Sequence, residues 1–198
     1  MDKLFYEKQL LSEGYNYICG VDEVGRGPLA GPVVCAAVIM PLDAVIEGVD
    51  DSKKLTAKRR EKLSALIREK AIDIAICRVE PQIIDKINIL EATKLCMKNA
   101  VESLKTTPSF VLTDGNMTLD ISLPQRHIIG GDAVCYSIGA ASVLAKVYRD
   151  ELMNGYAAEY PGYGFERNKG YGTAAHIAAI EERGLCPIHR RSFTKKWI

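Results

Sequence analysis

The sequence lacks an excess of either charge. Its 198 residues include 26 Lys and Arg against 25 Asp and Glu, for a net charge of +1. A large excess of one sign would point to an oppositely charged partner such as nucleic acid, so here only local clusters can do so. The overall charge therefore leaves the class of partner open.

Cysteine pairs with the spacing of a metal or redox motif are also absent. The six cysteines form no C-x-x-C pair, and they are Cys19, Cys35, Cys77, Cys96, Cys135 and Cys186. Most of them lie in apolar runs, which is typical of buried and reduced thiols. This pattern argues against a zinc finger or a thioredoxin-like motif and predicts a reducing compartment.

Long apolar runs and an export signal are missing as well. The run from Val33 to Met40 stops at Pro41, far short of the ~20 residues that a membrane helix needs. The N-terminal stretch MDKLFYEK lacks the apolar core of a signal peptide. We therefore expect a cytoplasmic protein with no membrane partner.

What the chain does contain is enough apolar sequence for one core. Apolar residues make up 47% of it, and no repeat, low-complexity segment or linker divides it, so we expect a single domain over residues 1–198. Hydrophobic patterning predicts strands at 17–24, 33–40, 71–79, 110–113 and 127–129. Helices are predicted at 3–13, 57–70, 82–104, 132–156 and 174–183. The first two strands should be antiparallel neighbours, and the whole pattern predicts an α/β domain with a mixed sheet.

Four acidic residues share one placement in this pattern. Each sits at or just after the carboxyl end of a predicted strand, and they are Asp22, Glu23, Asp114 and Asp132. Ligands bind at that edge of open α/β sheets, and hard carboxylate oxygens favour Mg²⁺ or Mn²⁺. Four crowded carboxylates would repel one another unless cations neutralise them. Two ions ~3.5–4 Å apart would suit a phosphodiester, with one activating water and the other stabilising the leaving oxygen.

Simpler interpretations stay open for two of these acids. Asp114 before Gly115 is also a good turn residue, and Asp132 is also a suitable N-cap for a long helix. Asp150 lies on the same predicted helix, roughly 27 Å along its axis from Asp132. Asp150 is therefore too distant for the same metal site, and we interpret it as a surface residue.

The glycine-rich stretch after Asp22 and Glu23 has two interpretations. Its Gly25-x-Gly27-x-x-Ala30 spacing partly matches a dinucleotide-binding fingerprint, but that fingerprint opens a helix, whereas a Val-rich strand follows here. We therefore favour a turn whose backbone approaches a sugar–phosphate chain. The two acids would point to opposite faces of a regular strand, so we also expect the chain to bend, with Gly25 allowing the bend.

Basic and aromatic residues supply candidate contacts to such a chain. Lys53 and Lys54 lie in a polar loop near the predicted strand ends, where they can contact phosphates, whereas the cluster at 58–62 is interpreted as a solvated helix face. Tyr171 lies between two glycines, and its ring either stacks on a sugar or base or folds back onto the surface. Three histidines are isolated in the sequence and are interpreted as structural: His127, His176 and His189.

Seven ordered stretches carry a family resemblance: GVDEVGRGPLAGPVV (20–34), DSKKL (51–55), DGN (114–116), GGDA (130–133), AASVLAKV (140–147), NKGYGT (168–173) and HRRSF (189–193). Together they resemble bacterial ribonuclease HII, the type 2 ribonuclease H, over nearly the whole chain. The resemblance implies a ribonuclease H-like fold, which is a mixed five-stranded sheet flanked by helices, with a helical C-terminal part.

The same resemblance implies an activity and its residues. It implies a two-metal endonuclease that uses Mg²⁺ or Mn²⁺ to cleave the RNA strand of RNA/DNA hybrids and single ribonucleotides embedded in duplex DNA. Products would carry 5′-phosphate and 3′-hydroxyl ends. The family's four catalytic, metal-binding acids correspond to Asp22, Glu23, Asp114 and Asp132. The motif that reads the ribonucleotide 2′-hydroxyl corresponds to Gly25, Arg26 and Gly27, and the tyrosine that packs against the next sugar corresponds to Tyr171.

Some features distinguish this chain within the resemblance. Cys135, Tyr136 and Gly139 stand where the family usually has Lys or Ser, Ser and Ala, which puts substrate contacts at the start of the long helix in question. The Gly-Arg-Gly turn and the lack of a long N-terminal extension favour type HII over type HIII. No clear sliding-clamp motif follows Phe193, which leaves a clamp open as a partner, and we expect a monomer.

Two other functions fit the same residues. One is a different two-metal enzyme, such as a DNA nuclease or a phosphatase, built on the same acids. The other is a nucleic-acid binding module without catalysis. Cleavage of duplexes that differ only in their sugars discriminates among the three.

Overall fold

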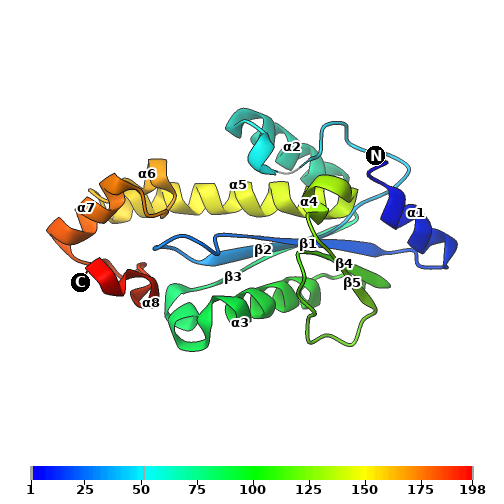
Figure 1. The fold of residues 1–198 in the computed structure, drawn as a ribbon. Coiled ribbons are helices and arrows are strands. Elements are labelled where there is room, and N and C mark those ends of the chain that lie inside the picture. The colour runs from blue at the N-terminus through cyan, green and yellow to red at the C-terminus, as the bar shows by residue number, and fades with distance from the viewer. Residues whose placement is uncertain (1, 51, 198) are drawn as a thin grey trace.

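The computed structural model describes residues 2–50 and 52–197, and of Lys54 only the backbone. In chain order the elements are α1 (Phe5–Ser12), β1 (Ile18–Val24), β2 (Val33–Ile39), η1 (Ser52–Lys54), α2 (Ala57–Lys70), β3 (Asp73–Val79), α3 (Pro81–Glu102), β4 (Phe110–Asp114), β5 (Gln125–Ile128), α4 (Gly131–Val134), α5 (Tyr136–Glu159), α6 (Phe165–Asn168), α7 (Ala174–Arg183), α8 (Arg191–Thr194) and η2 (Lys195–Trp197). The strands form one sheet between two layers of helices, as Figure 1 shows.

The sheet is mixed, as the sequence predicted. Its strand order is β3-β2-β1-β4-β5. β1 pairs with β2 and β2 with β3 in antiparallel fashion, whereas β1 pairs with β4 and β4 with β5 in parallel fashion. The short connection between the first two strands therefore does give an antiparallel pair. The carboxyl ends of β1 and β4 lie side by side near the middle of the sheet.

Both faces of the sheet are covered, so β2 is apolar along its whole length. Every residue of β2 is buried. Val33, Cys35 and Ala37 pack with α3, whereas Val34 and Ala36 pack with α5 and α2. Figure 1 shows α3 on one side of the sheet and α5 with α2 on the other. None of the helices within residues 2–50 and 52–197 has both the length and the apolar composition of a bilayer span.

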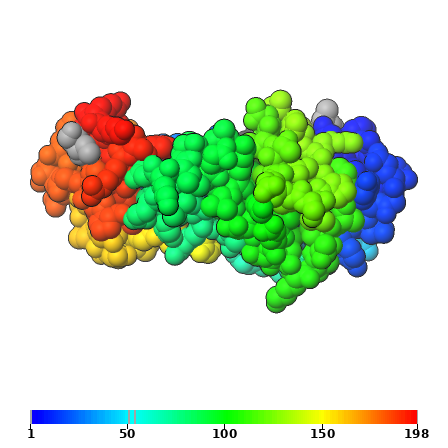
Figure 2. Space-filling view, turned by 90° about the horizontal axis from the view of Figure 1, so that it is seen from below, coloured from blue at the N-terminus to red at the C-terminus, as the bar shows by residue number. Residues whose placement is uncertain are grey.

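The C-terminal segments pack beyond the end of the sheet. Their own apolar cluster joins residues far apart in the sequence, including Leu29, Met153, Phe165 and Ile180. Figure 2 shows these segments gathered at one end of the molecule, next to α3. The loop between β1 and β2 is therefore covered by the last quarter of the chain.

The long helix predicted over 132–156 is wrong in one respect, because it is divided at Cys135. That residue is extended, with φ −121° and ψ 127°, and it separates α4 from α5. The cause is the buried Glu7 of α1, whose Oε1 accepts hydrogen bonds from the Ser137 N–H at 2.8 Å and the Cys135 thiol at 3.1 Å. A carboxylate at the start of α5 satisfies backbone donors there and lets a new helix begin. The predicted loop 161–172 also contains a short helix, α6.

Candidate metal centre and its surrounding loops

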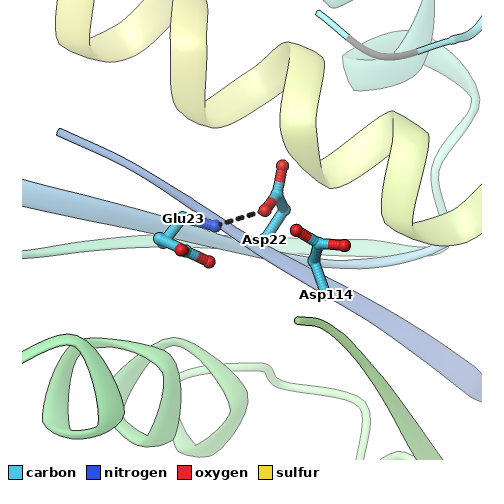
Figure 3. Close-up of side chains that lie close together, drawn as sticks. All are labelled: Asp22, Glu23 and Asp114. Carbon is cyan, nitrogen blue, oxygen red and sulfur yellow. Dashed lines mark hydrogen bonds between the residues drawn. The ribbon is translucent and has the colours of Figure 1, made fainter. Parts of the chain in front are cut away.

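Three carboxylates meet at the carboxyl ends of β1 and β4. Asp22 and Glu23 lie near the end of β1, and Asp114 is the last residue of β4. The parallel pairing of the two strands ends at Val21 and Thr113, so both strands bring their acids to the same edge. One oxygen of each carboxylate lies within 4.8 Å of the others, and Figure 3 shows how the three side chains lie together. The structure thus unites three of the four predicted acids.

Asp22 and Glu23 reach this site without the bend that we expected. β1 stays paired with β2 through both residues, with Asp22 opposite Ala36 and Glu23 opposite Cys35. Ala36 packs with α5 and Cys35 with α3, so the two acids leave opposite faces of the strand. They meet around the edge of β1, because its pairing with β4 has ended before them. The positive-φ turn at Gly25 comes only after the strand.

Burial and mutual repulsion disfavour three negative charges in this cluster. Burial raises the pKa of Asp22 well above its usual value, and the charges of Glu23 and Asp114 add to the effect. Burial also raises the pKa of Glu23, against an opposing contribution from Arg26, whose Nη1 lies 3.3 Å from Glu23 Oε1. The buried Oε2 of Glu23 has no hydrogen-bond partner within the described residues. A divalent cation fits this oxygen set, because it would neutralise the charges and coordinate that oxygen.

Asp132 lies beside the three-carboxylate cluster and is not part of it. It is buried in the first turn of α4, and its neighbour Gly131 donates its N–H to Asp114 Oδ1 at 2.7 Å. Its Oδ2 lies 3.5 Å from Lys53 Nζ. Since the N-cap of α4 is Gly130, the interpretation of Asp132 as a helix cap is wrong. Its role as a fourth metal ligand stays a prediction.

The turn after β1 requires glycine at its first position. Gly25 has a φ of +92°, and a Cβ there would lie 2.2 Å from Arg149 Nε. A Cβ on Gly27 would lie 3.7 Å from Tyr171 Cε1, so the tyrosine ring lies against the turn. Arg26 stands between the two glycines with a half-exposed side chain. The turn and the ring therefore form one surface next to the carboxylates.

Two buried arginines hold this turn from behind, and the sequence analysis missed both roles. Arg149 of α5 donates hydrogen bonds of 2.9 to 3.1 Å to the carbonyls of Ala30, Pro32 and Lys169. Arg190 donates to the carbonyls of Gly25, Arg26 and Gly31. Burial lowers the pKa of Arg149 to about 10 and that of Arg190 to about 9. Arg149 lies four residues after the buried Ala145 and four residues before the buried Met153. Residues four apart share one face of a helix, so this spacing could have predicted that Arg149 is buried.

The polar loop after β2 is anchored to the helices around it. Ser52 Oγ lies 2.9 Å from Ser142 Oγ of α5, and Arg60 of α2 donates to the Ser52 carbonyl at 3.0 Å. This leaves the Lys53 side chain 77% exposed at the edge of the site. The side chain of Lys54 lies outside the described part of the structure.

The exposure of two side chains bears on two further expectations. Tyr171 is 44% exposed, so its ring is available for stacking. Asp150 is not the surface residue that we expected, because its partly buried carboxylate lies 2.7 Å from Lys146 Nζ and 3.6 Å from Arg60 Nη2. It remains apart from the three-carboxylate cluster, as its distance along the helix implied.

Comparison with known proteins points to one family. The model of the Ribonuclease HII family matches residues 19–196. A ribonuclease HII of Ruminiclostridium cellulolyticum is 53% identical to this chain over 195 residues, which is 98% of this chain and 76% of that protein. The match therefore includes both the carboxylates and the C-terminal segments that hold the turn.

Solved structures share the fold. The ribonuclease H2 of Pyrococcus horikoshii superposes with a TM-score of 0.80 at 27% identity, covering 92% of this chain and 97% of that one. The RNase HII of Archaeoglobus fulgidus, solved in complex with PCNA, gives 0.73 at 24% identity over 90% and 94% of the two chains. Bst-RNase HIII in complex with Mn²⁺ gives 0.65 at 20% identity over 93% and 67%. The last two likenesses show the fold alone, and together with the first they confirm the expected ribonuclease H-like architecture.

Proposed function

The chain belongs to the ribonuclease HII family, and on that premise we propose that it cleaves the RNA strand of RNA/DNA hybrids and single ribonucleotides embedded in duplex DNA. The family gives the coarser activity directly, which is that of a metal-dependent ribonuclease H acting on nucleic acid. One observation carries the finer proposal: the three-carboxylate cluster lies beside a rigidly held glycine turn that faces Tyr171. A metal site next to a backbone surface suits a cut that depends on the sugar.

The acids of the site hold and orient divalent ions. We assign Asp22, Glu23 and Asp114 to Mg²⁺ or Mn²⁺, with Asp132 completing the site from α4. Two bound ions would lower the pKa of an attacking water and stabilise the leaving oxygen. The N–H groups of Glu23 and Gly131 already fix Asp22 and Asp114, so their oxygens are placed before substrate arrives. Breaking the bond between phosphorus and the 3′-oxygen leaves 5′-phosphate and 3′-hydroxyl ends.

The glycine turn gives the site a means to read ribose. RNA differs from DNA by the 2′-hydroxyl, which both donates and accepts hydrogen bonds. Because Gly25 and Gly27 have no side chains, the backbone of the turn can approach that hydroxyl closely. The hydrogen bonds from the buried arginines hold this backbone in position. Arg26 extends from the same turn, and Tyr171 stacks on the sugar that follows the ribonucleotide. Lys53 and Lys54 contact phosphates of the duplex.

A single chain supplies every residue named for this reaction. We therefore propose that the enzyme works as a monomer on its duplex substrate. A sliding clamp would recruit the enzyme to DNA and would add no residue to the metal centre.

The decisive test uses three duplexes that differ only in their sugars. They are an all-DNA duplex, the same duplex with one ribonucleotide, and an RNA/DNA hybrid, each incubated with Mg²⁺ or Mn²⁺. We expect cleavage of the second and third, no cleavage of the first, and complete loss of activity with a chelator. Equal cutting of the all-DNA duplex would favour a different two-metal nuclease and overturn the proposal.

A pair of matched variants tests the metal centre. Asp114→Asn keeps the shape of the side chain and removes a charged ligand, so we expect kcat to fall about a hundredfold or more while duplex binding persists. Asp120→Asn is the control, because that carboxylate is 99% exposed and pairs with Lys98 away from the site. Full cleavage by Asp114→Asn would remove the metal site that we assign.

A further inference from the structure

Two buried histidines form a hydrogen-bonded chain behind Tyr171. His176 of α7 and His189 of the segment after it are 0% and 3% exposed. Their Nε2 atoms lie 3.1 Å apart. At one end His176 Nδ1 lies 2.8 Å from the Tyr171 carbonyl oxygen, and at the other the Cys186 N–H points to His189 Nδ1 at 3.0 Å. The two hydrogen-bonded histidines thus join the backbone of the loop at Tyr171 to the backbone of the loop at Cys186.

The backbone groups at its ends serve to assign the protons of the two imidazoles. A carbonyl only accepts, so His176 Nδ1 carries a proton and donates to Tyr171. At the other end His189 Nδ1 lies 3.0 Å from the Cys186 N–H and 3.3 Å from the Cys186 carbonyl oxygen. The shorter contact requires an acceptor, so we place the proton of His189 on Nε2. His189 Nε2–H therefore donates to His176 Nε2, and each imidazole is neutral with both nitrogens engaged. A further proton on His176 Nε2 would set two N–H groups against each other at 3.1 Å.

The surroundings keep this pair neutral. The rings of Tyr163 and Phe165 pack against both imidazoles, with centroids 5.0 to 6.5 Å away. The titratable groups that face the pair are Tyr163 and Cys186, whose Sγ lies 3.1 Å from His189 Nδ1. Arg190, the next residue, directs its guanidinium to the carbonyls of the glycine turn. Burial accordingly lowers the pKa of both histidines.

The backbone on either side of Tyr171 carries no side chain that would hold the ring in place. Tyr171 is flanked by Gly170, which has a φ of +84°, and by Gly172. Glycine imposes little restriction on the backbone on either side of the ring. The Gly170 carbonyl accepts from the Leu29 N–H at 2.8 Å, and the Tyr171 carbonyl accepts from Thr173 N–H as well as from His176. The histidine chain ties this peptide to α7 and to the segment after it.

We propose that His176 and His189 are positioning residues that hold the Tyr171 ring against the Gly25–Gly27 turn, and so set the preference for a single ribonucleotide followed by DNA over a continuous hybrid. The inference deepens the proposed function and rests on it. Without the His176 donor, the Tyr171 carbonyl keeps the Thr173 N–H of its own loop but loses its tie to the His176 side chain of α7, so the loop can shift and carry the ring away from the turn. Cleavage of a hybrid depends less on that ring, because every sugar of its RNA strand offers a 2′-hydroxyl.

The test measures a ratio that cancels changes in the metal centre. This ratio is kcat/KM on the one-ribonucleotide duplex divided by kcat/KM on the hybrid. His176→Phe keeps an aromatic ring in the core and removes the donor, so we expect the ratio to fall about tenfold, the scale of one lost stacking contact. His176→Asn keeps a donor near the Nδ1 position and should restore the ratio. The double variant His176→Phe/Tyr171→Ala should show the ratio of Tyr171→Ala alone, because both changes act through one ring.

A packing control separates positioning from stability. Phe165→Leu disturbs the same cluster without touching the hydrogen-bonded chain, so it should lower Tm and leave the ratio unchanged. If His176→Phe does not fold, His189→Asn tests the chain from its other end, because it keeps an acceptor for Cys186 N–H and removes the donor to His176. An unchanged ratio in the folded histidine variant, or additive effects in the double variant, overturns the inference. Equal cutting of all-DNA and one-ribonucleotide duplexes by the wild type instead overturns the proposed function, and the inference with it.

Discussion

The backbone of the Gly25–Gly27 turn and of the loop after it is held by two buried arginine side chains. Arg190 binds the Gly25 carbonyl, and Arg149 fills the space where a side chain of Gly25 would be. The sequence revealed the acids, because each follows a recognisable strand end. It did not reveal the arginines, because a guanidinium that binds carbonyls has no partner charge to mark it. The glycine motif showed that a turn was needed, and only the structure showed what holds it.

Gly25→Ala should cost stability and activity together. A residue with a Cβ pays roughly 1–2 kcal/mol for the left-handed conformation, and this Cβ must also displace Arg149. We expect the free energy of unfolding in urea to fall by about 2–4 kcal/mol. We also expect kcat/KM on the one-ribonucleotide duplex to fall at least about tenfold, because the shift displaces the turn that we propose binds the 2′-hydroxyl.

Gly155→Ala is the control for that change. Gly155 lies in α5, and a Cβ there would meet nothing within 4 Å. Alanine favours helix over glycine, so the free energy of unfolding should rise by about 0.5–1 kcal/mol with cleavage unchanged. A Gly25→Ala protein as stable and active as the wild type would contradict the steric argument.

Among the elements, local signals predicted the hairpin of β1 and β2 but not the division between α4 and α5. The hairpin follows from β-branched runs and a short connection, both of which are local. The division at Cys135 comes from Glu7, a residue of α1 that is remote in sequence. No pattern within 131–159 encodes a cap supplied from elsewhere. The meeting of Asp22 and Glu23 around a strand edge was missed for a similar reason, since it depends on where β4 ends.

Glu7→Ala should weaken the start of α5. The carboxylate accepts two hydrogen bonds there and lies at the positive end of the helix dipole. We expect the free energy of unfolding in urea to fall by about 1–2 kcal/mol, and by less for Glu7→Gln, which keeps an acceptor without the charge. Glu13→Ala, at an exposed position after α1, should change it by less than about 0.5 kcal/mol. Equal losses in Glu7→Ala and Glu13→Ala would show that Glu7 is not a cap.

For the molecule as a whole, the strand pattern predicted the mixed sheet and the edge that carries the acids. It did not predict that the last quarter of the chain covers the loop between β1 and β2. This packing depends on a cluster that unites Leu29 with residues of α5, α6 and α7. It also depends on two hydrogen bonds, in which the Gly31 N–H donates to the Ile188 carbonyl and the Arg190 N–H donates to the Leu29 carbonyl. Such contacts join positions with no shared periodicity, so they emerge only from the packed chain.

The pair of buried histidines in these C-terminal segments makes the stability of the molecule depend on pH. Burial, together with the charge that His176 would carry, lowers the pKa of His189 to about 4 in the folded chain, whereas an unfolded histidine titrates near 6.5. Between these values the unfolded chain binds more protons than the folded chain. The free energy of unfolding therefore falls as the pH drops below about 6.5, and the full contribution of the neutral pair is present only above that value.

His189→Asn isolates this effect from the titration of the carboxylates, which both proteins share. Asparagine can still accept from the Cys186 N–H, but it does not titrate. Urea unfolding at about pH 7 and about pH 5 should show the wild type losing about 2 kcal/mol more than the variant over that interval. Equal losses would mean that His189 takes up its proton as readily in the folded chain as in the unfolded one. The hydrogen-bonded pair would then accept a charged His189 at about pH 5, and at that pH Tyr171 would have to be held by its remaining contacts with the 29–31 segment and α7.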